Sequence, residues 1–270
     1  MDQALFHVDG PLLVPTGLTR GGWSDDAQHG SPPSGILARA VEMVPTAATM
    51  QVVRFTVDLF REVPLRPLIV ETDVLRDGRR IQLVQARLSE NGREIGRAIA
   101  LKIRVTDLAD GEELRGTARE DHPPSPGPES LPVLDWRDFF GPGGDLRRFH
   151  TDGVEIRTVD DSFVRAVPGE SWFRLLAPLV DGEELTPFQR AAVAADLANG
   201  NAQALDPKRW LYVNPDITLY LSRLPVGEWI GMRSVVHQQP HGIGVTESAF
   251  YDLSGRIGHI SQAQILERRY

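Results

Sequence analysis

Two stretches of the chain place apolar residues at helical spacing. In residues 31–44, SPPSGILARAVEMV, apolar side chains recur three or four positions apart after a proline-containing start. A second run, TPFQRAAVAADLANG, begins at Thr186, a favourable N-cap residue. Because this periodicity gathers apolar side chains on one helical face, it predicts one helix in each half of the chain.

Each predicted helix is followed by four segments rich in β-branched residues. In the first half these are QVVRFTVDLF, LIVETDVLRD, RIQLVQARLSE and EIGRAIALKIRV, with the turn signals RDGRR and ENGRE between strands. In the second half they are WLYVNPDITLYL, EWIGMRSVVHQ, GVTESAFYDL and IGHISQAQILE. The segments align between the halves, pairing Pro64 with Pro225 and Gly96 with Gly258. The pattern therefore indicates two copies of a unit with one helix and a four-stranded antiparallel meander.

The two copies are separated by a segment that favours neither helix nor sheet. Six prolines and four glycines fall between Asp121 and Gly144. We therefore expect an N-terminal unit at 1–106, a linker at 107–150 and a C-terminal unit at 151–270. Because an antiparallel sheet must cover its apolar face, the predicted fold is α+β, with two antiparallel sheets joined edge to edge and each wrapped round a central helix.

Composition narrows the classes of partner. The 270 residues are 41% hydrophobic, which is ordinary for a globular core, and carry a net charge of −8. This charge repels a phosphate backbone, so we expect no nucleic acid partner. The absence of cysteine excludes disulfides, thiolate metal sites and a cysteine nucleophile. With no apolar stretch of about 20 residues and no signal-peptide pattern at the start, we expect a cytoplasmic protein without membrane contact.

The copies differ at two polar positions. Asp196 falls on the second helix where the first has Gly35, and Gln262 falls where the first copy has Ala100. Because the fold does not demand these side chains, the difference suggests a site in the second copy. The alternative is that Asp196 faces water at the end of its helix and that Gln262 is an exposed strand residue. The polar face of NPDITLYLS, with Asn214 and Thr218, could line a cleft.

These segments resemble a known family. The runs WFRLLAPLVDGEELTPFQRAAVAADLANG, NPDITLYLSRLPVGEWIG and YDLSGRIGHISQAQILERR are similar to the type II (TesB-like) acyl-CoA thioesterases, which are double hotdogs. The resemblance implies that an aspartate, a hydroxyl or amide residue and a glutamine orient a hydrolytic water. Asp196 and Gln262 match the first and last of these. Asn214 occupies the middle position in place of threonine, and Thr218 is a possible substitute.

The resemblance implies hydrolysis of acyl-CoA by water, with no metal and no cofactor. We expect partial burial to raise the basicity of Asp196. Backbone N–H groups at the first helix start, around Gly30, Ser34 and Gly35, are candidate oxyanion donors. The acyl chain is expected in an apolar tunnel between helix and sheet. The candidates for contacting the coenzyme A phosphates are Arg79, Arg80, Arg223 and Arg233.

Other readings of the sequence stay open. His29 with Asp196 could form the pair of a hotdog dehydratase or hydratase, although no G-D-x-N-P-x-H run is present. A hotdog with an altered middle residue could also bind acyl thioesters without cleaving them. His237 and His241 have a metal-like spacing, but their proline and glycine neighbours favour a turn. A homo-oligomer, such as a dimer of double hotdogs, is possible.

Overall fold

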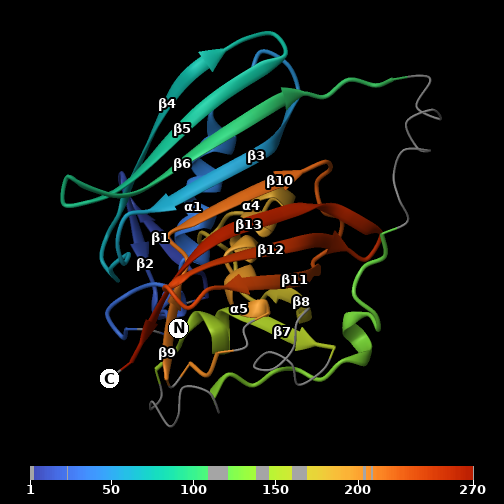
Figure 1. Ribbon diagram of the computed structural model, residues 1–270. Coiled ribbons are helices and arrows are strands. Elements are labelled where there is room, and N and C mark those ends of the chain that lie inside the picture. The colour runs from blue at the N-terminus through green and yellow to red at the C-terminus, as the bar shows by residue number, and fades with distance from the viewer. Residues whose placement is uncertain are drawn as a thin grey trace.

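The computed structural model describes residues 3–22, 24–108, 121–137, 146–159, 169–202, 205–207 and 209–269. It has two similar halves, in each of which an antiparallel sheet wraps round a helix (Figure 1). This is the α+β double hotdog predicted from the sequence. The linker predicted at 107–150 lies partly outside the described residues.

The N-terminal half begins with a hairpin that the periodicity did not predict. The hairpin consists of β1 (Phe6–Asp9) and β2 (Leu12–Pro15), and a short turn η1 (Gly17–Thr19) follows it. The helix α1 (Ser31–Met43) precedes the meander of β3 (Met50–Leu59), β4 (Ile69–Asp77), β5 (Ile81–Glu90) and β6 (Arg93–Arg104). On β5, Val84, Ala86 and Leu88 are buried in the core that includes residues of α1. Strand alternation thus gives the sheet one apolar face for the helix.

The C-terminal half repeats this plan with additional elements. Before its helix come the turns η2 (Pro128–Ser130) and η3 (Phe149–Gly153), and the strands β7 (Val154–Thr158) and β8 (Gly169–Leu175). The helices are α4 (Pro187–Ala195) and α5 (Ala198–Asn201). The remaining strands are β9 (Trp210–Val213), β10 (Asp216–Leu221), β11 (Ile230–Gln238), β12 (Ile243–Asp252) and β13 (Gly255–Arg268).

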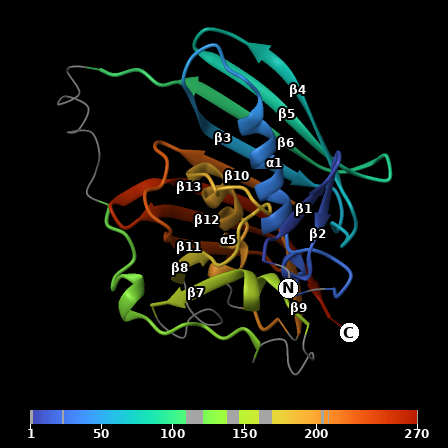
Figure 2. The same ribbon diagram turned by 180° about the vertical axis from the view of Figure 1, so that it is seen from behind.

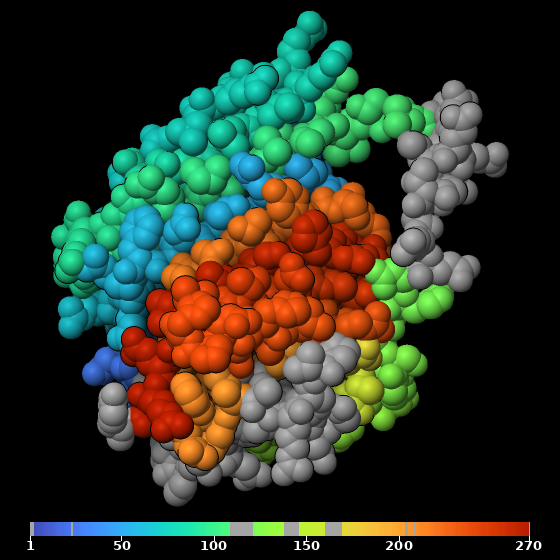
Figure 3. All heavy atoms as spheres, viewed as in Figure 1, coloured from blue at the N-terminus to red at the C-terminus, as the bar shows by residue number. Residues whose placement is uncertain are grey.

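The two halves share one sheet. In the described part of the chain, eleven strands pair antiparallel in the order β4-β5-β6-β3-β10-β13-β12-β11-β8-β7, with β9 pairing to β13. The seam is the β3–β10 pair, in which Thr56 lies opposite Thr218. Figure 3 shows both halves joined there in a continuous outer surface. Edge-to-edge pairing satisfies the backbone groups that two separate sheets would leave open at this edge.

The helices α1 and α4 pack closely against each other on the inner side of the sheet. Figure 2 shows the helices on this side. Gly35 makes the approach possible, because a Cβ there would come within 2.6 Å of Val193 Cγ2. Polar contacts add to this packing, since Glu42 of α1 accepts hydrogen bonds from Thr186 and Gln189 at 2.7 and 3.0 Å. The helix packing brings the start of α1 near the end of α4.

Besides the unpredicted β1–β2 hairpin, the structure differs from the sequence prediction in three places. The strands β7 and β8 were not predicted. The single strand predicted for WLYVNPDITLYL is divided into β9 and β10, because Pro215 has no N–H to donate. The predicted second helix is likewise divided, since α4 ends at Ala195 and α5 begins at Ala198. The last two differences both shape the site.

Candidate active site

A cavity of about 370 Å³ lies where the two halves meet. Its walls come from the residues leading into α1, the end of β3 with the following loop, the end of α4 with α5, and β9 with the turn after it. Among the residues singled out in the sequence, Asp196, Asn214, Gly30 and His29 line this cavity. The cavity is therefore built from both copies. Its wall includes Asp196, one of the two polar residues that distinguish the second copy from the first.

Asp196 is held inside the protein at the end of α4. The helix starts at the N-cap Thr186, whose hydroxyl accepts a hydrogen bond from the Gln189 N–H, and Asp196 is its C-cap residue. Only 4% of the Asp196 surface is exposed. The alternative of a solvent-facing carboxylate therefore does not apply. A buried carboxylate is stable only with hydrogen-bonding partners, which the neighbouring elements supply.

Three side chains contact the Asp196 carboxylate. Asn214 donates a hydrogen bond from Nδ2 to Oδ1 at 2.8 Å, and its place in the break between β9 and β10 allows this contact. His29 Nδ1 lies 3.0 Å from Oδ2. The Ser31 hydroxyl is 3.4 Å from the same oxygen. Because His29 and Ser31 belong to the first copy, the cluster exists only in the folded protein.

These contacts determine the charge state of Asp196. Burial alone would raise the pKa of this carboxyl, but the charge and hydrogen bond of His29 and the hydrogen bonds of Asn214 and Ser31 outweigh it. The pKa is held below its ordinary value. Our expectation that burial would raise the basicity of Asp196 was therefore wrong, because it omitted the partners from the first copy. Asp196 is an ionised acceptor at neutral pH.

Gln262 lies behind the cluster. It is fully buried on the inner side of β13, and its Nε2 lies 3.4 Å from the carbonyl oxygen of Ala195, the residue before Asp196. Its Oε1 has no hydrogen-bond partner among the described residues, and Gln262 does not line the cavity. The alternative of an exposed strand glutamine does not apply. In this geometry Gln262 supports the backbone at the end of α4.

Thr218 does not join the cluster. Its neighbours Ile217 and Leu219 point into the core, so Thr218 lies on the outer face of β10. There its hydroxyl is 3.4 Å from that of Thr56 across the seam. The polar face of this strand therefore does not line the cavity that holds Asp196. Of the two candidates for the middle position, only Asn214 contacts Asp196.

The three candidate oxyanion residues have different surroundings. Gly30 lines the cavity, and its backbone N–H has no hydrogen-bond partner in the described part of the chain. Ser34 is buried and donates a hydrogen bond from its hydroxyl to the Gly30 carbonyl at 2.9 Å. Gly35 packs against α4 as described above, and neither Ser34 nor Gly35 lines the cavity. Of the three, only Gly30 is placed to meet a ligand.

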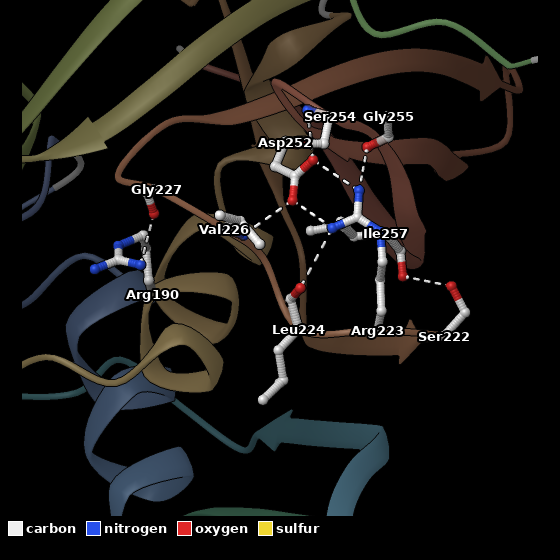
Figure 4. A network of polar contacts seen from close by, with 10 residues as sticks. All are labelled: Arg190, Ser222, Arg223, Leu224, Val226, Gly227, Asp252, Ser254, Gly255 and Ile257. Carbon is white, nitrogen blue, oxygen red and sulfur yellow. Dashed lines mark hydrogen bonds and ion pairs between the residues drawn. The ribbon is translucent and has the colours of Figure 1, made fainter. Parts of the chain in front are cut away.

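The arginines chosen from the sequence do not line the cavity. Arg223 forms a paired ion contact with the buried Asp252, which also accepts hydrogen bonds from the N–H groups of Val226 and Ser254 (Figure 4). Arg233 pairs with Glu170. Such bidentate or partnered guanidinium groups are poor candidates for capturing an external phosphate, because an existing partner must be displaced.

Arg79 and Arg80 are exposed in the turn between β4 and β5. Arg61, which the sequence analysis did not single out, lines the cavity together with Glu62. It is exposed and has no ion-pair or hydrogen-bond partner among the described residues. No pattern in the sequence distinguished Arg61 from the other surface arginines, because only the fold brings it to the cavity.

Among the described residues, the space between α4 and the strands β7, β8 and β11 is small. The space there, lined by residues such as Val193, Leu197 and Ile230, has a volume of about 10 Å³. This is room for about one water molecule. The described residues that line this space therefore leave no room for an acyl chain there.

The sequence analysis missed a second set of polar side chains, which links α5 to β11 and β13. Asn199 lines the cavity, donates a hydrogen bond to the Tyr212 carbonyl at 3.1 Å, and accepts one from Gln264 Nε2 at 2.7 Å. Gln238 in turn donates to Gln264 Oε1 at 3.0 Å. The repeated glutamine at alternate positions of β13 was the available signal. This chain of amides fixes the wall of the cavity below Asp196.

The described residues contain no group of three or more histidine, aspartate or glutamate side chains placed to hold a metal ion. His237 is exposed on β11, and His241 is exposed in the turn after it.

None of the described helices is both long and apolar enough to cross a membrane.

Solved structures share this fold across nearly the whole chain. A candidate thioesterase II from Thermobifida fusca superposes with a TM-score of 0.72 at 17% identity, covering 98% of this chain and 96% of that one. The acyl-CoA thioesterase II TesB2 from Mycobacterium marinum gives 0.66 at 18% identity, covering 99% and 96%. A hot dog protein of unknown function from Alicyclobacillus acidocaldarius gives 0.69 at 13% identity, covering 100% and 97%. At these identities the likeness defines the class of fold, the hotdog.

Family profiles assign the chain more closely. The acyl-CoA thioesterase N-terminal domain matches residues 19–103, and the acyl-CoA thioesterase C-terminal domain matches residues 119–265. The chain therefore belongs to the acyl-CoA thioesterase family with this two-domain arrangement. No curated protein is detectably similar to it in sequence.

Proposed function

We propose that this protein hydrolyses an acyl-CoA thioester to a free acid and coenzyme A, using a water molecule held beside Asp196. The observation that carries the proposal is a carboxylate that is almost fully buried yet lies in the wall of a cavity and is fixed by Asn214 and His29. Membership of the thioesterase family supports the same reaction. The reaction uses water and protein groups, so we propose no cofactor.

The chemistry requires an oriented water and a donor for the developing oxyanion. Asp196 stays ionised, so it can accept a hydrogen bond from the attacking water and direct the water lone pair at the thioester carbon. The N–H of Gly30, which has no hydrogen-bond partner among the described residues, belongs to a residue of the same wall and is the proposed oxyanion donor. A preorganised backbone donor of this kind stabilises charge that appears only in the transition state.

The cavity also suggests how the substrate is placed. Because the space beside α4 that is lined by Val193, Leu197 and Ile230 holds only about 10 Å³, we place the acyl group in the cavity of about 370 Å³, together with the thioester end of coenzyme A. We therefore propose short acyl groups as substrates. Arg61 at the cavity is the proposed contact for the coenzyme A phosphates, with Glu62 beside it opposing the same anions.

A release assay tests the proposal. Free thiol is measured after mixing the protein with acetyl-, butyryl-, octanoyl- and palmitoyl-CoA, and Asp196→Asn is compared with the wild type. We expect thiol release from the short substrates and a loss of about a hundredfold or more in kcat for the variant. If the wild type binds these thioesters but releases no thiol, the protein is an acyl-thioester-binding hotdog instead.

One observation favours a second candidate function. The His29 and Asp196 side chains meet at 3.0 Å, as the dehydratase reading requires. A dehydratase or hydratase would convert a 3-hydroxyacyl-CoA to the enoyl-CoA with the thioester intact. Enoyl absorbance and free thiol measured on the same sample separate the two reactions. The homo-oligomer suggested by the sequence stays a prediction, which the mass of the protein in solution would test.

A further inference from the structure

The contacts of Asp196 limit its capacity to take a proton from water. Its Oδ1 accepts a hydrogen bond from Asn214, and its Oδ2 is contacted by both His29 and Ser31. These donors hold the pKa of the carboxyl below its ordinary value. A carboxylate that is stabilised in this way is a good hydrogen-bond acceptor but a weak base. Another group beside it is better suited to accept the proton.

His29 is the neighbouring group with that capacity. Its Nδ1 lies 3.0 Å from Asp196 Oδ2 and 3.1 Å from the backbone nitrogen of Ser31. One ring nitrogen cannot donate a proton to the carboxylate and accept a hydrogen bond from the Ser31 N–H at the same time. A lone pair facing a buried carboxylate would be repelled, so we place the proton on Nδ1. In the neutral ring this leaves Nε2, on the opposite edge, as an acceptor. His29 itself lines the cavity.

The ring of His29 is fixed by its other contacts. It stacks on Phe149 with the ring centroids 5.0 Å apart and an interplanar angle of 24°. His150 meets it edge-on, with the centroids 4.4 Å apart at 89°. The segment that carries both rings therefore holds the imidazole against Asp196. Preorganisation of this kind is what an efficient general base requires.

Several charged or titratable side chains among the described residues contact His29 or line the cavity with it. Asp196 contacts it from the end of α4, His150 faces it from η3, and Arg61 and Glu62 line the same cavity. Burial, with the nearby His29 and Arg148, holds the pKa of His150 well below its ordinary range, so that ring stays neutral.

We propose that His29 is the general base of the hydrolysis and that Asp196 orients it, an assignment that rests on the proposed function. A water proton moves to His29 Nε2 as the water oxygen bonds to the thioester carbon, and the carbonyl electron pair moves onto its oxygen. When this intermediate collapses, the C–S bond breaks and the Nε2 proton passes to the sulfur. The products are the acid and coenzyme A with its thiol, so atoms and charge balance. The division of roles between histidine and carboxylate is that of a catalytic dyad.

The test compares His29→Gln, Asp196→Asn and the double variant, with His241→Gln as the control at an exposed histidine. The kcat/KM for butyryl-CoA release is measured from pH 5 to 9. In the wild type we expect the rate to fall toward acid pH with the titration of an imidazole, which ordinarily occurs between about pH 5 and 8. His29→Gln should lower kcat by about a hundredfold or more and remove this limb. The double variant should be little worse than either single variant, because the two residues act as a unit.

The results separate this proposal from the proposed function. If the wild type releases no thiol from any substrate, the proposed function fails. If the wild type is active and His29→Gln keeps the wild-type rate and the acid limb, the proposed function stands and the assignment of His29 is overturned. A merely structural role for His29 predicts a lower melting temperature in His29→Gln with an unchanged pH profile, which would also overturn it.

Discussion

The carboxylate of Asp196 lies directly against the α-carbon of Gly30. A Cβ built on Gly30 would come within 2.7 Å of Oδ2 and 2.8 Å of Oδ1, closer than a side chain can approach. The contact joins the C-cap of α4 in one copy to the N-cap of α1 in the other. The absence of a side chain at Gly30 is therefore a condition for the position of the acid.

Replacing this glycine tests whether the position matters. In Gly30→Ala the added methyl must displace the Asp196 carboxylate, and we expect kcat to fall by about a hundredfold with a smaller effect on KM. Steady-state kinetics with a short acyl-CoA measure this. Gly127→Ala is the matched control, since its φ of −66° suits alanine and nothing lies within 4 Å of the added Cβ. A wild-type kcat in Gly30→Ala would show that catalysis does not depend on the position of the Asp196 carboxylate beside Gly30.

The lowered pKa of Asp196 predicts how stability depends on pH. A carboxyl whose folded-state pKa lies below 3.8 stabilises the folded protein above pH 3.8, and this contribution is lost as the pH falls through the folded value. Asp196→Asn lacks the contribution at every pH. The difference in unfolding free energy between the two proteins should therefore shrink below pH 3.8. Urea titrations at pH 7 and pH 3 measure it, and an equal difference at both would contradict the assigned pKa direction.

The charges at the cavity predict opposite effects on substrate affinity. Arg61→Gln should raise KM for acyl-CoA by about fivefold, and Glu62→Gln should lower KM, with kcat little changed in both. Both effects should weaken at high salt, because the two side chains are exposed. Arg80→Gln, in the distant β4–β5 turn, is the control and should leave KM unchanged. Equal KM values in Arg61→Gln and the control would remove Arg61 from the substrate contact.

The small volume of the space beside α4 predicts that the protein prefers short acyl chains. Leu197→Ala should enlarge the void lined by Leu197, Val193 and Ile230, and raise kcat/KM for octanoyl-CoA relative to butyryl-CoA. It should also cost about 2–5 kcal/mol of stability. Leu37→Ala, at a fully buried position of α1 away from this void, is the control for destabilisation alone. If both variants show the same ratio of octanoyl to butyryl activity, the void does not limit chain length.

Periodicity predicted the repeated core of the fold because the helix and the long strands carry complete amphipathic patterns. It missed the β1–β2 hairpin and the strands β7 and β8, which are short. It also joined β9 to β10, although the Asn214–Pro215 pair carried the signal for a break. A short strand contains too few alternating apolar and polar residues for its pattern to be recognised.

For the site, the sequence identified Asp196, Asn214 and Gly30. It also raised the His29–Asp196 pair as an alternative, but it did not reveal how these contacts act on the pKa of Asp196. The position of Asn214 beside Asp196 follows from the resemblance, whereas the lowered pKa of Asp196 depends on His29 and Ser31 from the other copy. Likewise, nothing in the sequence indicated that Arg61 lines the cavity. Contacts between segments distant in the sequence arise from packing, and the periodicity of one sequence does not reveal them.

The most direct test of the central claim is thiol release from butyryl-CoA by the wild type and by Asp196→Asn at the same concentration and pH, with a cooperative thermal unfolding transition above the assay temperature showing that each protein is folded. The account predicts sustained turnover by the wild type and a loss of about a hundredfold or more in the variant. Equal rates of thiol release from the two proteins would contradict it.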